Sequence, residues 1–220
     1  MRQDYYDKIA PRGQLIVVSG PSGVGKRTVL RKYMMEHPRA CHSVSATTRD
    51  PRPNEVDGVD YFFLTIEEFD RQIRTNQMLE YAYYNHHCYG TPKKGVEDAR
   101  AAGKNVILEI EVNGAMQVKK LCPDATLVFI MPPSWAELER RLRERNTETE
   151  EAIQERLEIA KEEIAMADQY DYIIVNDTVE KAISRFAQIV HGHRYSINCM
   201  TEFLKTYIEG EIQAKERLAY

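Results

Sequence analysis

The stretch that decides the fold is Gly20-Pro21-Ser22-Gly23-Val24-Gly25-Lys26, which follows the apolar run Leu15-Ile16-Val17-Val18. Apolar residues at helical spacing come next: Val29, Leu30, Tyr33 and Met34. A buried strand, a G-x-x-x-x-G-K turn and a helix, in this order, form a phosphate cradle. Its glycines let backbone N–H groups face inward, and the helix N-terminus adds partial positive charge. We therefore predict a phosphate site here, with Lys26 reaching the β- and γ-phosphates of a nucleotide.

One residue departs from this pattern. The hydroxyl that usually follows the lysine and binds Mg²⁺ is replaced by Arg27, and the nearest hydroxyl belongs to Thr28. The arginine adds bulk and charge, and the sequence leaves open whether it contacts a phosphate or points to solvent.

Further apolar runs continue the strand pattern along the chain. They are short, β-rich and separated by helical patterns: Val106-Ile107-Leu108, Leu127-Val128-Phe129-Ile130 and Tyr172-Ile173-Ile174-Val175. This alternation is typical of an α/β fold with a parallel sheet between helices. Two stretches interrupt it, about 45–91 and the arginine-rich segment 140–147. In the first, we predict that residues 61–63 and 79–83 form antiparallel strands.

Several helix boundaries are marked by capping residues. Thr91-Pro92 predicts a helix start that Gly103 ends, and Ser134 with Glu137, like Thr65 with Glu68, has the spacing of a capping box. Residues 150–167 carry one apolar stripe, which predicts a helix with a single buried face.

Composition restricts the class of protein. The 220 residues are 43% hydrophobic and 29% charged, as in a soluble globular domain, and the net charge is −4. This charge argues against nucleic-acid binding. No apolar run approaches the roughly 20 residues of a membrane span. The four cysteines form no C-x-x-C pair, which favours free thiols, and we expect a cytoplasmic protein without membrane contact. Two short histidine-containing stretches, 86–88 and 191–193, lack further ligands at zinc-site spacing.

A second anion site is predicted by Arg49-Asp50-Pro51-Arg52. The proline forces an extended turn, which would direct both guanidinium groups to one point. Planar guanidinium groups suit a phosphate, although either arginine alone could belong to a solvated basic loop.

These motifs together resemble the guanylate kinase family. The resemblance runs from about residue 13 to residue 187 and includes Gly20 to Lys26, the S-x-T-T-R-x-P-R element that begins at Ser45, and Asn146-Thr147-Glu148-Thr149. It implies a P-loop NTPase fold with a five-stranded parallel core sheet flanked by helices. The core would comprise residues 1–44 and 92–220, with a mixed-β GMP-binding insertion at 45–91. A helical lid would lie at about 140–160, and a C-terminal helical extension at about 191–220.

The resemblance also assigns roles to residues. It implies an ATP site formed by Gly20, Pro21, Ser22, Gly23, Val24, Gly25, Lys26, Arg27, Thr28 and Asn176. It implies a GMP site in which Arg49, Arg52, Tyr61 and Tyr89 hold the phosphate, Ser45, Glu80 and Thr91 read guanine, and Glu109 lies near the base. The catalytic group would be Lys26, Arg49, Arg141, Arg145 and Arg156, the last three in the lid.

The chemistry of guanine agrees with this assignment. One edge of guanine presents two donors and one acceptor, which a carboxylate such as Glu80 and a hydroxyl such as Ser45 or Thr91 can satisfy. Adenine would leave Glu80 unpaired. Ordinary alternatives are an exposed charge for Glu80 and simple packing for Tyr61 and Tyr89.

The implied cofactor is Mg²⁺, bound with ATP. Glu109 and Glu111 follow the strand at 106–108 and lie on the same side of it by alternation. Thr28 and Glu111 are the expected Mg²⁺ residues, directly or through water. Glu109 and Glu111 could instead face a neighbouring arginine, and the lid arginines could pair with nearby glutamates.

Three functions fit the sequence. The first is a Mg²⁺-dependent transfer of phosphoryl from ATP to GMP, giving ADP and GDP. The second is a guanylate-kinase-like binding module with impaired catalysis, and Arg27 is the only residue that favours it. The third is a ribose bisphosphate phosphokinase, which would not need Ser45, Glu80 and Thr91. The sequence does not distinguish a monomer from a homo-oligomer. The apolar stripe of the C-terminal segment predicts a docked helix or a dimer contact.

Overall fold

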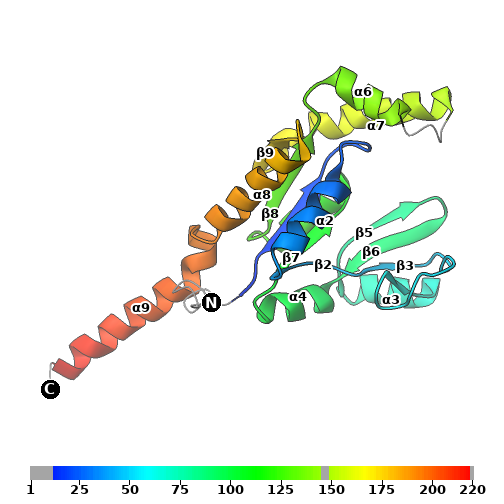
Figure 1. Ribbon diagram of the computed structural model, residues 1–220. Coiled ribbons are helices and arrows are strands. Elements are labelled where there is room, and N and C mark those ends of the chain that lie inside the picture. Colours follow the sequence, from blue (N-terminus) through cyan, green and yellow to red (C-terminus); the bar gives the residue numbers. More distant parts are fainter. Residues whose placement is uncertain (1–11, 145–148, 219–220) are drawn as a thin grey trace.

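The computed structural model describes residues 12–144 and 149–218 (Figure 1). Its central element is a parallel sheet of five strands in the order β2-β7-β1-β8-β9. The strands are β1 (Leu15–Ser19), β2 (Ala40–His42), β7 (Asn105–Glu109), β8 (Thr126–Met131) and β9 (Tyr172–Val175). This arrangement confirms the predicted α/β class. The four apolar runs are all strands. The edge strand β2 is short and half-exposed, and because it contains no apolar run the sequence did not predict it.

Helices cover both faces of this core sheet. They are α2 (Lys26–Glu36), α4 (Lys93–Ala101), α5 (Val112–Leu121) and α8 (Val179–His193). Side chains of β1 alternate between the faces: Ile16 and Val18 pack with α2 and α8, while Leu15 and Val17 pack with α4 and α5. Because β1 is central and wholly buried, its carboxyl end is fixed by the two cores.

A second sheet has four strands in the order β4-β3-β6-β5. They are β3 (Ser45–Thr47), β4 (Tyr61–Phe63), β5 (Met78–Tyr84) and β6 (His87–Pro92), with the helix α3 (Ile66–Arg74) packed beside them. β5 and β6 form the expected antiparallel pair. The expectation for residues 61–63 was wrong, since β4 runs parallel to β3. The long connection between β3 and β4 permits this crossover, whereas a tight turn would have enforced an antiparallel hairpin.

The segment expected to form a lid contains α6 (Trp135–Arg143) and α7 (Glu150–Ala165), followed by the short helix η1 (Ala167–Gln169). The two helices bury a small apolar cluster of their own: Leu138, Leu142, Ile153, Leu157 and Ala160. The first part of the predicted stripe on residues 150–167 therefore packs against α6, whereas its last members, Ile164 and Ala167, pack against the core of the five-stranded sheet.

Two of the predicted caps are present. The hydroxyl of Thr65 accepts a hydrogen bond from the N–H of Glu68, and that of Ser134 accepts one from Glu137. The cap predicted at Thr91 was wrong. The Thr91 hydroxyl donates instead to Glu80, and Pro92 precedes α4 without a side-chain cap.

The last helix, α9 (Ile197–Leu218), extends away from both sheets (Figure 1). Apolar side chains on its described part, among them Leu204, Tyr207 and Ile208, are exposed. These three side chains are therefore not packed on either sheet, which contradicts the predicted docked helix for this part of α9, while the predicted dimer contact stays a prediction. Within the described ranges, no helix is both long and apolar enough to cross a membrane.

Candidate active site

A cavity of about 720 Å³ lies where the carboxyl ends of β1 and β7 face the second sheet. Carboxyl ends of parallel strands are where α/β folds bind ligands. The predicted residues that line the cavity are Gly20, Lys26, Arg27, Ser45, Arg49, Arg52, Tyr61, Tyr89, Thr91, Glu109 and Glu111. They come from five separate parts of the chain, so folding joins the predicted phosphate-binding turn, residues 20–26 (the phosphate loop), to the residues expected to hold GMP.

The phosphate loop has a backbone that only glycine tolerates. Gly20, Gly23 and Gly25 have φ values of +144°, +86° and +95°. A Cβ on Gly20 would lie 2.2 Å from the carbonyl oxygen of Ile130. Lys26 is at the first position of α2, and its ammonium donates to the carbonyl oxygens of Gly20 and Pro21. The ammonium is thus held over the loop that should receive the phosphates.

Arg27 and Thr28 differ in position. Both are exposed, but Arg27 lines the cavity and Thr28 does not. The departure at Arg27 therefore adds a cation to the cavity. Thr28, expected to help bind Mg²⁺, is not among the lining residues.

Residues expected in the lid and ATP site hold the phosphate loop from its other side. Arg141 donates to the carbonyl oxygens of Val24 (3.2 Å) and Asn176 (3.0 Å), and the Asn176 amide also donates to Val24 (2.8 Å). Arg156 donates to the hydroxyl of Ser22 at 3.0 Å. Neither arginine lines the cavity. Arg145 lies outside the described residues, as does Asn146.

Arg49 is oriented by a carboxylate that the sequence did not single out. One guanidinium nitrogen donates to both oxygens of Glu55 at 3.0 Å, and the group lies 5.5 Å from the ring centre of Tyr61. Glu55 also accepts from the N–H of Arg52 at 2.7 Å. This backbone bond and the Arg49 guanidinium lower the pKa of Glu55 below its ordinary value. Asn54 has a φ of +75°, a conformation that asparagine adopts more readily than most other non-glycine residues.

Glu80 lies behind the cavity wall rather than in it. It is only 6% exposed, and its carboxylate accepts a 2.6 Å hydrogen bond from Thr91, which does line the cavity. Burial raises the pKa of Glu80, and the negative charge of Glu111 raises it further. A buried carboxylate beside a hydroxyl is suited to a ligand that offers more than one N–H donor.

Besides Glu55 and Asp60, which accept backbone hydrogen bonds, three carboxylates give the cavity oxygen ligands for a cation. Glu109, Glu111 and Glu163 all line it, and Glu163 is a lining residue that the sequence analysis missed. Glu163 is three residues after the buried Ala160, so the two residues share a face of α7, and this spacing could have predicted that Glu163 points inward. Burial raises the pKa of Glu163, while nearby Lys26 opposes the shift.

The donor chemistry fits Mg²⁺, which prefers oxygen ligands and keeps several waters. Within residues 12–144 and 149–218, however, no three acidic, histidine or cysteine side chains lie close enough to hold a metal by themselves. These carboxylates could therefore contact a metal ion only together with other ligands, and phosphate oxygens or water would have to complete the coordination of the ion.

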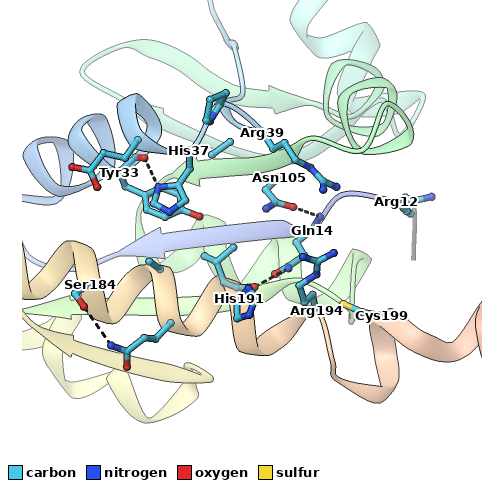
Figure 2. Close-up of a pocket in the computed structure, with 16 residues that line it drawn as sticks. Arg12, Gln14, Tyr33, His37, Arg39, Asn105, Ser184, His191, Arg194 and Cys199 are labelled. Carbon is cyan, nitrogen blue, oxygen red and sulfur yellow. Dashed lines mark hydrogen bonds between the residues drawn. The ribbon is translucent and has the colours of Figure 1, made fainter. Parts of the chain in front are cut away.

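A second cavity, of about 680 Å³, lies at the opposite end of the core sheet, where β1, β2 and β7 begin (Figure 2). None of the predicted site residues lines it. Two of its arginines have protein acceptors, since Arg12 donates to Glu97 and Arg39 to the carbonyl oxygen of Gly103. The Gln14 side chain, which Figure 2 shows in its wall, donates to the carbonyl oxygen of Val190 at 2.8 Å. We assign no ligand to this cavity.

Known proteins resemble the chain over most of its length. Residues 12–193 match the family described as guanylate kinase. The chain is 50% identical to a guanylate kinase of Bacillus cereus over 201 residues, 90% of this chain and 98% of that protein. It is 46% identical to one of Thermus thermophilus over 207 residues, 94% of each.

A solved structure agrees with the sequence comparisons. The crystal structure of guanylate kinase from Anaplasma phagocytophilum matches with a TM-score of 0.66 and 33% identity, over 85% of this chain and 89% of that one. The fold, the cavity and these relatives lead to one conclusion. This chain belongs to the guanylate kinase family.

Proposed function

We propose that the protein transfers the γ-phosphoryl group of ATP to GMP, giving ADP and GDP, with Mg²⁺ accompanying ATP. The observation that carries this proposal is one cavity lined both by the phosphate loop at Lys26 and by the arginine pair Arg49 and Arg52. A kinase needs both, because its donor and acceptor are phosphates that repel each other until cations neutralise them.

On the donor side, the phosphate loop would bind ATP. Its inward N–H groups, the N-terminus of α2 and Lys26 supply the positive charge. The hydrogen bonds of Arg141 and Arg156 to the loop support a role for the lid in shaping this site. The buried Asn176 oxygen Oδ1 has no hydrogen-bond partner in the described structure, which supports an adenine contact there.

On the acceptor side, Arg49, Arg52, Tyr61 and Tyr89 would bind the GMP phosphate, while Ser45, Glu80 and Thr91 would read guanine with Glu109 nearby. The Arg49–Glu55 pair supports this, because an oriented guanidinium loses less entropy when it binds. Guanine offers an N1–H and a 2-amino group to Glu80, and its O6 accepts from a hydroxyl.

The reaction itself needs positioning and charge neutralisation. An oxygen of the GMP phosphate attacks the γ-phosphorus as the bond to the bridging oxygen of ADP breaks in line, with no covalent enzyme intermediate. Lys26 and the lid arginines would stabilise the charge on the transferred group. Mg²⁺ would neutralise phosphate oxygens, with Glu111 as the expected residue that lines the cavity, whereas Thr28, the other expected residue, lies outside the lining.

The experiment is an ADP-release assay with ATP, Mg²⁺ and each of GMP, AMP, CMP, UMP and ribose bisphosphate. We expect turnover with GMP, a fall of at least about 100-fold in kcat for Lys26→Ala, and loss of guanine preference for Glu80→Ala. Turnover of ribose bisphosphate would identify the related phosphokinase. A folded protein that binds GMP but turns over no acceptor would be a binding module.

A further inference from the structure

The strand that carries Glu80 is an edge strand. β5 is the outermost strand of the second sheet, so the backbone groups on its free side lack a neighbouring strand. At Tyr81, the residue after Glu80, a side chain takes that place. The Gln117 carboxamide accepts from the Tyr81 N–H at 3.1 Å and donates to the Tyr81 carbonyl oxygen at 3.0 Å.

Gln117 belongs to α5, which also touches the Glu80 side chain. Gly114 is three residues earlier on this helix, and a Cβ there would lie 2.9 Å from Oε2 of Glu80. The other carboxylate oxygen accepts from Thr91. Residues three apart share a helix face, so one face of α5 holds the backbone beside Glu80 and borders its carboxylate.

This arrangement matters because β5 is irregular at the same place. The pairing register with β6 shifts between Met78 and Glu80. A bulge leaves a residue locally unpaired and redirects a side chain. The two-point contact of Gln117 fixes the strand directly after that irregularity, where a slip would move the carboxylate.

We infer that Gln117 is a positioning residue which sets the preference of the enzyme for guanine by holding Glu80 against Thr91. The inference rests on the proposed contact between Glu80 and the base. Gln117 itself touches no substrate in this scheme. Replacement of Gln117 should weaken recognition of the acceptor base. It should leave the phosphate loop unchanged, because no hydrogen bond given for Gln117 reaches that loop.

The test is Gln117→Met, which keeps length and removes both hydrogen bonds. The matched control is Gln72→Met, since Gln72 is also half-buried and donates to Glu68 at 3.1 Å from the helix α3. For both variants we would measure kcat and KM with GMP, with IMP, which lacks the 2-amino group, and with ATP. Thermal unfolding and exchange of the Tyr81 amide hydrogen complete the set.

For Gln117→Met we expect a KM for GMP raised about tenfold, a GMP-to-IMP preference reduced by a similar factor, and an unchanged KM for ATP. The Tyr81 amide should exchange faster. Unchanged GMP-to-IMP preference in a folded variant would overturn the inference, and so would equal losses for ATP and GMP. Gln72→Met should change none of these.

Gly114→Ala is the second variant, in case Gln117→Met does not fold. Alanine favours the helix, yet its methyl group would press on Glu80, so a lower GMP-to-IMP preference at undiminished stability is expected. Unchanged preference would count against the inference.

Glu80→Gln separates the two levels of the argument. If it leaves the GMP-to-IMP preference intact, the proposed base contact itself is wrong. If it alters the preference while the α5 variants do not, only the role of Gln117 fails.

Discussion

Gly25 lies where backbone conformation and packing both exclude a side chain. Its φ is +95°, and a Cβ would lie 2.8 Å from the Asn176 amide nitrogen that bonds Val24. We predict that Gly25→Ala loses about 1–2 kcal/mol of unfolding free energy from the left-handed backbone alone. The KM for ATP should also rise, because the Asn176 contact is displaced. Urea unfolding and steady-state kinetics would test this, and an unaltered KM would mean that the loop adapts.

Glu80 gives a prediction about pH. Burial raises its pKa in the folded protein, so between the unfolded value of about 4.5 and the raised value the folded state binds more protons. The contribution of Glu80 to the unfolding free energy therefore falls as pH rises through that window, because burial disfavours the ionised carboxylate in the folded state. Glu80→Gln removes the ionisation.

We expect Glu80→Gln to gain stability relative to wild type at pH 7, and the gain to vanish below about pH 4.5. Urea unfolding across this range measures it. A gain that stays constant with pH would show that packing, rather than ionisation of Glu80, separates the two proteins.

Arg27 gives a prediction about salt. It is exposed and lines the cavity beside Lys26. We predict that Arg27→Ser raises the KM for GMP or ATP about threefold at low ionic strength, and that the difference shrinks at about 0.5 M salt through screening. Arg31→Ser, an exposed change on the same helix but outside the cavity lining, is the control. Equal effects of the two variants would deny Arg27 a local role.

At the scale of elements, the predicted lid, α6 with α7, has a small core of its own. Leu138 and Leu142 of α6 pack with Ile153, Leu157 and Ala160 of α7, apart from the clusters on the core sheet. Arg141 and Arg156, on these helices, bond the phosphate loop. The order of the lid helices therefore depends on few buried side chains.

We predict that Leu142→Ala weakens the lid by about 2–5 kcal/mol through the cavity that it leaves. Amide hydrogens of α6 and α7 should exchange faster, while those of β1 keep their protection because they report global unfolding. Loss of protection in β1 to the same extent would show that the lid and the core unfold together.

At the scale of the whole molecule, residues of both sheets line the cavity, and α9 extends away from both sheets (Figure 1). Its exposed Leu204, Tyr207 and Ile208 add no described apolar contact to either core. A chain ending after residue 196 should keep kcat and the KM for GMP within about twofold, and its thermal midpoint nearly unchanged. A large loss of activity on truncation would indicate that α9 supports the site, for instance within an oligomer.

Local patterns were enough to predict much of this protein. The phosphate loop follows from glycines that permit positive φ, the core strands from apolar runs, and the caps at Thr65 and Ser134 from hydroxyls that accept nearby N–H groups. Each depends on residues a few positions apart, so the sequence alone determined them, and with them the α/β class.

Other features depend on residues far apart in the chain, and only the tertiary structure decided them. Thr91 bonds Glu80 rather than capping α4, β4 runs parallel to β3, and Glu163 turns into the cavity. Gln117 holds a strand 36 residues before it. In each case the neighbouring residues in the sequence left several contacts open, and the packing of the sheets and helices determined which contact was made.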